Sequence, residues 1–169
     1  KGKFMMNTIF LPEGRLGATL KNRKYLSSLT SLEEAAAHGE ILESTAISCD
    51  TAHNLTVSLG VMKGIIPRSE GALGIAEGTV RDIALISRVG KPVTFIIEGF
   101  STDKNGERIA ILSRKKAQTR CLSEYISTLK PGDVINAKIT HIESFGAFCD
   151  IGCGCIALLP IDTISVSRI

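Results

Sequence analysis

The stretch that decides the fold is GDVINAKITHIESFGAFCDIGCGCIALLP, residues 132–160. Its apolar positions alternate after an opening glycine, an Asp-Ile-Gly turn follows, and a short apolar run ends at Pro160. Phe145 and Phe148 are three residues apart, and such residues point to opposite faces of a regular strand. Gly146 lies between them, and a glycine inside a strand often marks a bulge. We therefore expect a bulge at Gly146 that brings both rings to one face.

The order of these features resembles the S1 domain family, a five-stranded oligonucleotide-binding barrel named after the largest protein of the bacterial small ribosomal subunit. The shared marks are Gly-x-hydrophobic-hydrophobic at 132–135, Phe-Gly-Ala-Phe at 145–148, the glycine-containing turn and the apolar run. The resemblance implies that single-stranded RNA stacks its bases on Phe145 and Phe148. His141 would add a stack or a hydrogen bond, and Lys138 would meet a phosphate. The alternatives are that both phenyl rings are barrel core and that His141 is an ordinary surface histidine.

The chain also repeats itself. Residues 39–67 align with residues 132–160 at equal length, with a one-residue slip in the middle. This pattern predicts two copies of one barrel opening, the alternative being chance similarity between short strands. The slip sets His53 and Thr56 against Phe145 and Phe148, so the first copy lacks the aromatic pair. A single imidazole is a weaker platform for a base than two phenyl rings.

The expected fold class is all-β with small helical additions: a five-stranded antiparallel barrel of the oligonucleotide-binding type plus part of a second, joined by a helix. Residues 1–38 form an extension whose helix, at 22–38, carries the capping box Ser31-x-x-Glu34. Residues 39–116 form the first barrel, which strands at 92–100 and 108–113 complete, with a short helical turn within 78–89. Residues 117–131 form the linker helix. Residues 132–169 supply only three of the five strands that a barrel needs, which predicts a truncated second domain.

Composition narrows the function classes. The net charge of +3 is low for a protein that holds nucleic acid by charge alone. Among the basic clusters, Lys63 and Arg68 of the first barrel are further candidate RNA contacts, each open to the alternative of a solvated surface. No apolar run approaches the roughly 20 residues of a membrane span, and no secretory signal is evident. A cytoplasmic protein without a membrane partner is the expectation.

The five cysteines argue against a disulfide framework because their number is odd. Cys149, Cys153 and Cys155 lie close together, but no second cysteine pair or nearby histidine completes a four-ligand zinc site. We expect reduced thiols that pack as small apolar residues, with no metal and no cofactor.

Three functions were weighed from these features. The first is binding of single-stranded RNA or mRNA in translation, with the small ribosomal subunit as an expected partner. The second is a docking role for the first barrel, to which the apolar run at 60–66 would be suited. Exposure of His53 and Lys63 favours RNA, whereas burial favours docking. The third is the accessory part of a larger RNA-processing enzyme. We expect no catalysis by these residues themselves, because they contain no nucleophile triad, phosphate-cradling loop or metal knuckle.

Overall fold

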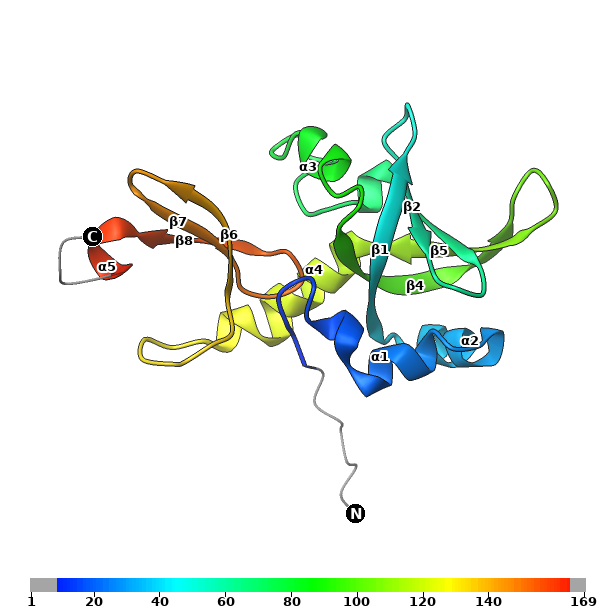
Figure 1. Cartoon of the computed structure of the whole chain (residues 1–169), viewed down its shortest axis with the longest axis horizontal. Coiled ribbons are helices and arrows are strands. Elements are labelled where there is room, and N and C mark those ends of the chain that lie inside the picture. Colours follow the sequence, from blue (N-terminus) through cyan, green and yellow to red (C-terminus); the bar gives the residue numbers. More distant parts are fainter. Residues whose placement is uncertain (1–8, 165–169) are drawn as a thin grey trace, which may run out of the picture.

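The computed structural model describes residues 9–164, and its first unit is a closed barrel (Figure 1). The strands follow one another around the barrel in the order β1 (Ile41–Cys49), β2 (Leu55–Ser58), β3 (Lys63–Ile66), β5 (Arg108–Ser113) and β4 (Pro92–Thr102). The expected five-stranded barrel is thus confirmed. Its pairings are antiparallel except that β3 and β5 run parallel, which is unavoidable because an odd number of strands cannot alternate in direction around a closed ring.

The core of the barrel is apolar throughout. Alternate residues of β2 and β4 point inward, among them Leu55, Val57 and Phe95, which are fully buried. The helix α2 (Leu29–His38) packs Leu32 and Ala35 into this same core. Removal of these side chains from water supplies the main driving force for closing the barrel.

Two short helices precede the barrel instead of the single helix expected at 22–38. A 3-10 turn at Leu16–Ala18 leads to α1 (Leu20–Tyr25), and α2 starts afresh at Leu29. The expected capping box at Ser31 and Glu34 was wrong, because Ser28 is the capping residue and its Oγ accepts the N–H of Ser31 at 3.1 Å. Such a cap satisfies a donor that a helix start otherwise leaves unpaired.

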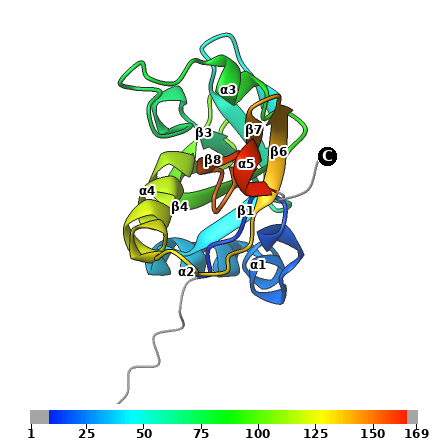
Figure 2. The same ribbon diagram turned by 90° about the vertical axis from the view of Figure 1, so that its left-hand side faces the viewer.

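The segment between β3 and β4 holds a 3-10 turn at Arg68–Glu70 and the expected short helix, α3 (Ile83–Ile86). After β5 the chain enters α4 (Arg114–Glu124) directly, with Ser113 as its cap. This helix begins before the expected linker boundary at 117 and ends earlier, in a 3-10 turn at Ile126–Thr128. It packs along β4 and carries the chain to the second unit (Figure 2).

The second unit is a three-stranded antiparallel sheet of β6 (Lys138–Glu143), β7 (Gly146–Asp150) and β8 (Ile156–Pro160), followed by α5 (Ile161–Ile164). Val134, expected in its first strand, precedes β6 and is 99% exposed. The bulge expected at Gly146 was also wrong. Glu143 pairs with Gly146, so Ser144 and Phe145 form a two-residue hairpin turn, and the register shift lies on β6 between Ile139 and His141.

The two units pair their strands in the same register. In the first, Ala46 lies opposite Val57 and Ser48 opposite Thr56, with a shift between the two pairs. In the second, Ile139 lies opposite Cys149 and His141 opposite Phe148, again with a shift between them. This agreement supports a repeated barrel opening. Of the helices within residues 9–164, none has the length and apolar character needed to cross a bilayer.

Candidate nucleic-acid interface

Three rings gather on one face of the second unit. Phe148, on β7, lies between the other two: the Phe145 ring meets it edge-on at 6.1 Å between centroids, and the His141 ring stacks on it at 6.2 Å with an interplanar angle of 22°. We call these three residues the ring cluster. Phe145 is 53% exposed and His141 is also exposed, whereas Phe148 is half-buried. The cluster therefore presents aromatic surface to solvent, which is what an unpaired base requires for stacking.

The hairpin turn, not a bulge at Gly146, brings Phe145 to Phe148. Phe145 belongs to the turn that precedes β7, so the alternation of side chains along a strand does not apply to it. Gly146 is still required for a different reason: a Cβ there would collide with the backbone carbonyl of Leu159 on β8. The glycine thus allows close approach of two strands behind the ring cluster.

Lys138 lies at the other end of the same sheet face. It pairs with Asp150, two residues along β7 from Phe148. Its ammonium group donates to the carbonyl of Glu13 at 3.3 Å, so it is directed toward the N-terminal segment. An ammonium has three donors, and the residue is exposed, which leaves capacity for a phosphate beside this contact.

The matching face of the first barrel differs in its side chains. At the register positions of His141 and Phe148 it has Ser48 and Thr56. Small hydroxyl side chains offer hydrogen bonds but no stacking area. The two copies therefore share a backbone and differ in the chemistry of the outer face.

His53 and Arg68, the other candidates of the first barrel, both turn to one acidic residue. The His53 Nδ1 contacts Asp82 Oδ2, while Arg68 binds the same carboxylate through two hydrogen bonds of 2.7 and 2.8 Å. These contacts, the arginine hydrogen bonds first, hold the pKa of Asp82 well below its usual range. His53 is half-buried and Arg68 is exposed. The positive charge of Arg68 is thus met within the protein.

Lys63 is exposed at the start of β3, with Leu29 and Arg108 lining the same groove. The exposure of Lys63 favours RNA binding by the first barrel, whereas the half-burial of His53 favours neither RNA binding nor docking. The structure does bring His53 and Arg68 together, but through Asp82, whereas Lys63 lies at the opposite end of its strand from Arg68.

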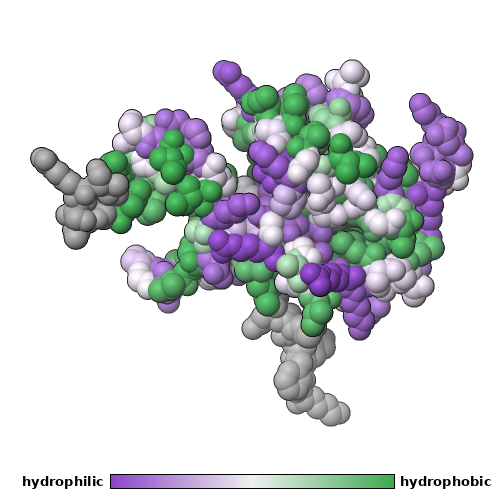
Figure 3. All heavy atoms as spheres, viewed as in Figure 1, coloured by the Kyte–Doolittle hydropathy of each residue, from purple (hydrophilic) through white to green (hydrophobic). Residues whose placement is uncertain are grey.

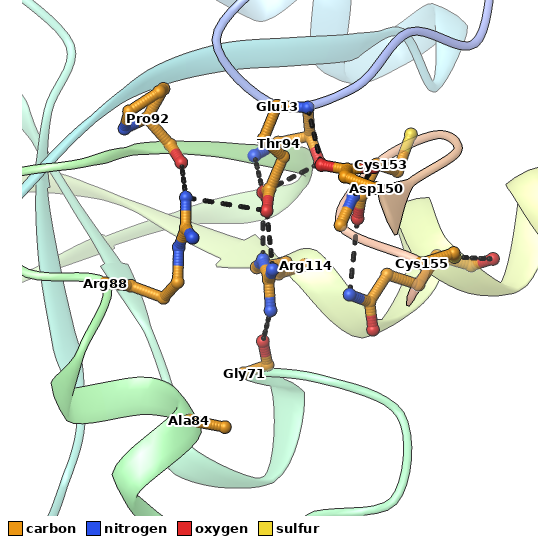
Figure 4. A network of polar contacts seen from close by, with 12 residues as sticks. Glu13, Gly71, Ala84, Arg88, Pro92, Thr94, Arg114, Asp150, Cys153 and Cys155 are labelled. Carbon is orange, nitrogen blue, oxygen red and sulfur yellow. Dashed lines mark hydrogen bonds and ion pairs between the residues drawn. The ribbon is translucent and has the colours of Figure 1, made fainter. Parts of the chain in front are cut away.

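A buried ionic network joins the N-terminal segment to both units (Figure 4). Glu13 accepts two hydrogen bonds from Arg114, at 2.5 and 2.9 Å, and one from the N–H of Thr94 at 2.7 Å. Its own N–H donates to Asp150 Oδ2 at 2.8 Å. Arg114 also donates to the carbonyl of Gly71 at 3.1 Å. We call Glu13, Thr94, Arg114 and Asp150 the junction network.

Burial acts on the two carboxylates of this network with different outcomes. Burial alone would raise the pKa of Glu13, but the charge and hydrogen bonds of Arg114 outweigh it, so the pKa lies below its ordinary value of 4.5. For Asp150, burial dominates over the backbone N–H groups that it accepts, and its pKa is raised. Its Oδ1 accepts the N–H groups of Gly152 and Gly154 at 2.9 and 3.1 Å, so Asp150 also shapes the turn before β8.

No local sequence pattern marks Glu13 or Arg114 as structurally important, because the two are 101 residues apart. Asp150 was noticed only as a turn residue. An acidic residue before a Gly-x-Gly turn would have been a usable signal for the turn, since Asp side chains often accept nearby backbone N–H groups. Within residues 9–164, no cluster of three or more His, Cys, Asp or Glu is arranged to hold a metal ion.

The opposite face of the second sheet is apolar and open. Ile142 is 71% exposed, and Ile139 and Leu159 share this face. Figure 3 shows apolar side chains gathered over this unit. The residues of the first unit that match Ile139 and Leu159 in register are Ala46 and Ile66, and both are fully buried inside the barrel.

Comparison with known proteins adds relatives at low identity. A scan against protein families finds no match. The small ribosomal subunit protein bS1 of Synechococcus elongatus is 26% identical over 153 residues, covering 90% of this chain and 46% of the relative. Those of Staphylococcus aureus and Mycolicibacterium smegmatis are each 27% identical, covering 92% and 93% of this chain and 39% and 31% of the relatives.

Among solved structures, the solution structure of GSP13 from Bacillus subtilis aligns with a TM-score of 0.37 and 18% identity, covering 57% of this chain and 62% of that chain. The chain spans less than half the length of the bS1 proteins that it matches. Over about nine-tenths of its own length, this chain is similar to bacterial small ribosomal subunit protein bS1.

Proposed function

We propose that the chain binds single-stranded RNA, with mRNA in translation as the ligand, through the ring cluster of its second unit. The observation that carries the proposal is the row of His141, Phe148 and Phe145 on the outer face of two paired strands. Stacking on such rings tolerates every base, because every base has a π-face. The similarity to bS1 supports a ribosomal setting, with the small subunit as partner and the cytoplasm as location.

The role is binding and not catalysis. The relatives are ribosomal proteins. The ring cluster offers stacking surface, and the carboxylate of Glu143 accepts from the His141 ring at 2.6 Å. That contact orients the imidazole beside Phe148.

The second unit, residues 132–169, is in this proposal the opening part of another barrel. Its open apolar face supports this, because the matching face of the first unit is covered by that unit's own β4 and β5. Two further strands would bury Ile139 and Leu159 as they bury Ala46 and Ile66.

The test is titration of a labelled, unstructured RNA against Phe148→Ala and Phe145→Ala. Each lost stack is expected to weaken binding by about 1–3 kcal/mol. The matched controls are Ser48→Ala and Thr56→Ala, which change the corresponding positions of the first barrel and should leave the affinity unchanged. Circular dichroism establishes that each variant is folded. Unchanged affinity in folded Phe148→Ala and Phe145→Ala proteins would overturn the proposal.

A docking role for the first barrel is favoured by two observations. His53 and Arg68 are occupied by Asp82, and the outer face holds Ser48 and Thr56 in place of rings. The first barrel then serves as a platform that positions the second unit, and contributes to RNA binding through charge alone.

A further inference from the structure

Three of the five cysteines meet where the linker helix touches the second unit. Cys121 belongs to α4, and Cys153 and Cys155 belong to the turn between β7 and β8. The Cys121 thiol lies within hydrogen-bonding reach of the other two thiols. The turn is so close to it that a Cβ on Gly152 would lie 2.6 Å from the Cys121 sulfur. All three thiols are free, and they lie where α4 meets this turn, to which Gln118 also donates a hydrogen bond, at the carbonyl of Cys153, at 3.2 Å.

The three thiols differ in burial and in their surroundings. Cys121 and Cys153 are buried in an apolar cluster with Ile41 and Ile96. Cys155 is half-buried and lines a partly open cavity of about 440 Å³ between α3 and β8. Arg114 and Gln118 line the same cavity. A small reagent that enters it therefore meets Cys155 before the other two.

The surroundings also favour the reactive form of Cys155. The neighbouring Cys121 thiol and then the charge of Arg114 lower the pKa of Cys155, despite burial and the nearby carboxylates of Asp150 and Glu13. The thiolate is the nucleophilic form of cysteine, and a neighbouring arginine is a common means of producing it. A second thiol in contact is what converts an oxidised cysteine into a disulfide.

We propose that Cys155 and Cys121 form a reversible oxidation site for peroxides. The Cys155 thiolate attacks the O–O bond, takes one oxygen to become a sulfenic acid, and releases the other oxygen as water or an alcohol once protonated. The Cys121 sulfur then attacks the Cys155 sulfur, the S–S bond forms, and the sulfenic oxygen leaves as water. The net reaction consumes two thiols and one peroxide. Its product ties α4 covalently to the turn before β8, across the junction of the two units.

The site does not depend on the proposed RNA binding and is tested without RNA. The full chain is treated with hydrogen peroxide and digested, and its peptides are analysed by mass spectrometry before and after reduction. The expected result is the loss of two hydrogen atoms and a cross-link between the peptides holding Cys121 and Cys155, which dithiothreitol reverses. Cys153→Ser should retain the cross-link, and Cys49→Ser serves as a control for an unrelated thiol.

A labelling measurement on the wild-type protein tests the proposal even where a variant fails to fold. Brief treatment with N-ethylmaleimide should label Cys155 well before Cys121 and Cys153. Equal labelling of the three in the folded protein would contradict the selective access. Over-oxidation of Cys155 with Cys121 left as a free thiol, or a cross-link that runs through Cys153, would overturn the proposed pair.

Discussion

Replacing Glu13 by alanine should cost far more stability than any surface ion pair of this protein. Glu13 is 2% exposed and holds a buried arginine with two hydrogen bonds. Within residues 9–164, its removal leaves Arg114 with its bond to the carbonyl of Gly71 and leaves the N–H of Thr94 without the Glu13 carboxylate. Breaking a buried pair by removing one partner typically costs about 3–5 kcal/mol. We expect the free energy of unfolding to fall by that amount.

The assay is urea unfolding followed by far-ultraviolet circular dichroism, since the chain contains no tryptophan. The matched control is Glu33→Ala, which breaks an exposed pair with Arg108 at 2.8 Å and should cost at most about 1 kcal/mol.

A double variant, Glu13→Leu with Arg114→Leu, should be less destabilised than Glu13→Ala, because the buried Arg114 guanidinium is not left without its carboxylate. A loss below about 1 kcal/mol for Glu13→Ala, equal to that of the control, would refute the reasoning that the junction network holds the units together.

Three further predictions concern pH, packing and the outer face. Because the pKa of Glu13 is lowered on folding, its charge stabilises the fold above pH 4.5, and this contribution is lost as the pH falls below 4.5. In urea titrations, the difference in unfolding free energy between wild type and Glu13→Gln should therefore narrow below pH 4.5. A constant difference would contradict the ion pair. Gly146→Ala should destabilise the protein by about 1–3 kcal/mol in thermal unfolding because its Cβ meets backbone, whereas Gly99→Ala, with open space around it, should not. Thr56→Phe places a ring at the position that matches Phe148, and we expect it to tighten RNA binding in the titration. Unchanged affinity would contradict the idea that one ring at this position suffices.

The strands of both units could be predicted from the sequence because their signals are local. Alternating apolar residues and the glycine that follows α2 each act within a few residues of the feature that they produce. The positive φ of 63° at Gly39 is such a case, since a left-handed residue after a helix is usually glycine. The repeat was visible for the same reason: two copies of one local pattern have the same spacing.

The sequence predicted that Phe145 and Phe148 lie together, but the structural reason that it suggested, a bulge at Gly146, was wrong. Phe145 and Phe148 do lie together, but the hairpin turn brings them together and not a bulge at Gly146. His53 and Arg68 were expected to face RNA, yet they meet Asp82, which follows them by 29 and 14 residues. No local pattern shows that a distant acid will neutralise a basic residue. The pairing of Glu13 with Arg114 could not be predicted for the same reason, because the two residues are far apart in the sequence.

The two units agree at the inward-pointing positions, which determine the backbone, and differ at the outward-pointing positions, which determine the chemistry of the outer face. The inward positions and the shift in register agree between them, since barrel geometry leaves little choice there. The outward positions are free of that constraint, and here Ser48 and Thr56 stand where the second unit has His141 and Phe148. An outer face can therefore gain or lose a stacking surface without changing the barrel beneath it. Under the proposed function the junction network then matters for RNA binding as well as stability, because it fixes the ring-bearing unit against a barrel that has Ser48 and Thr56 at two of the matching positions.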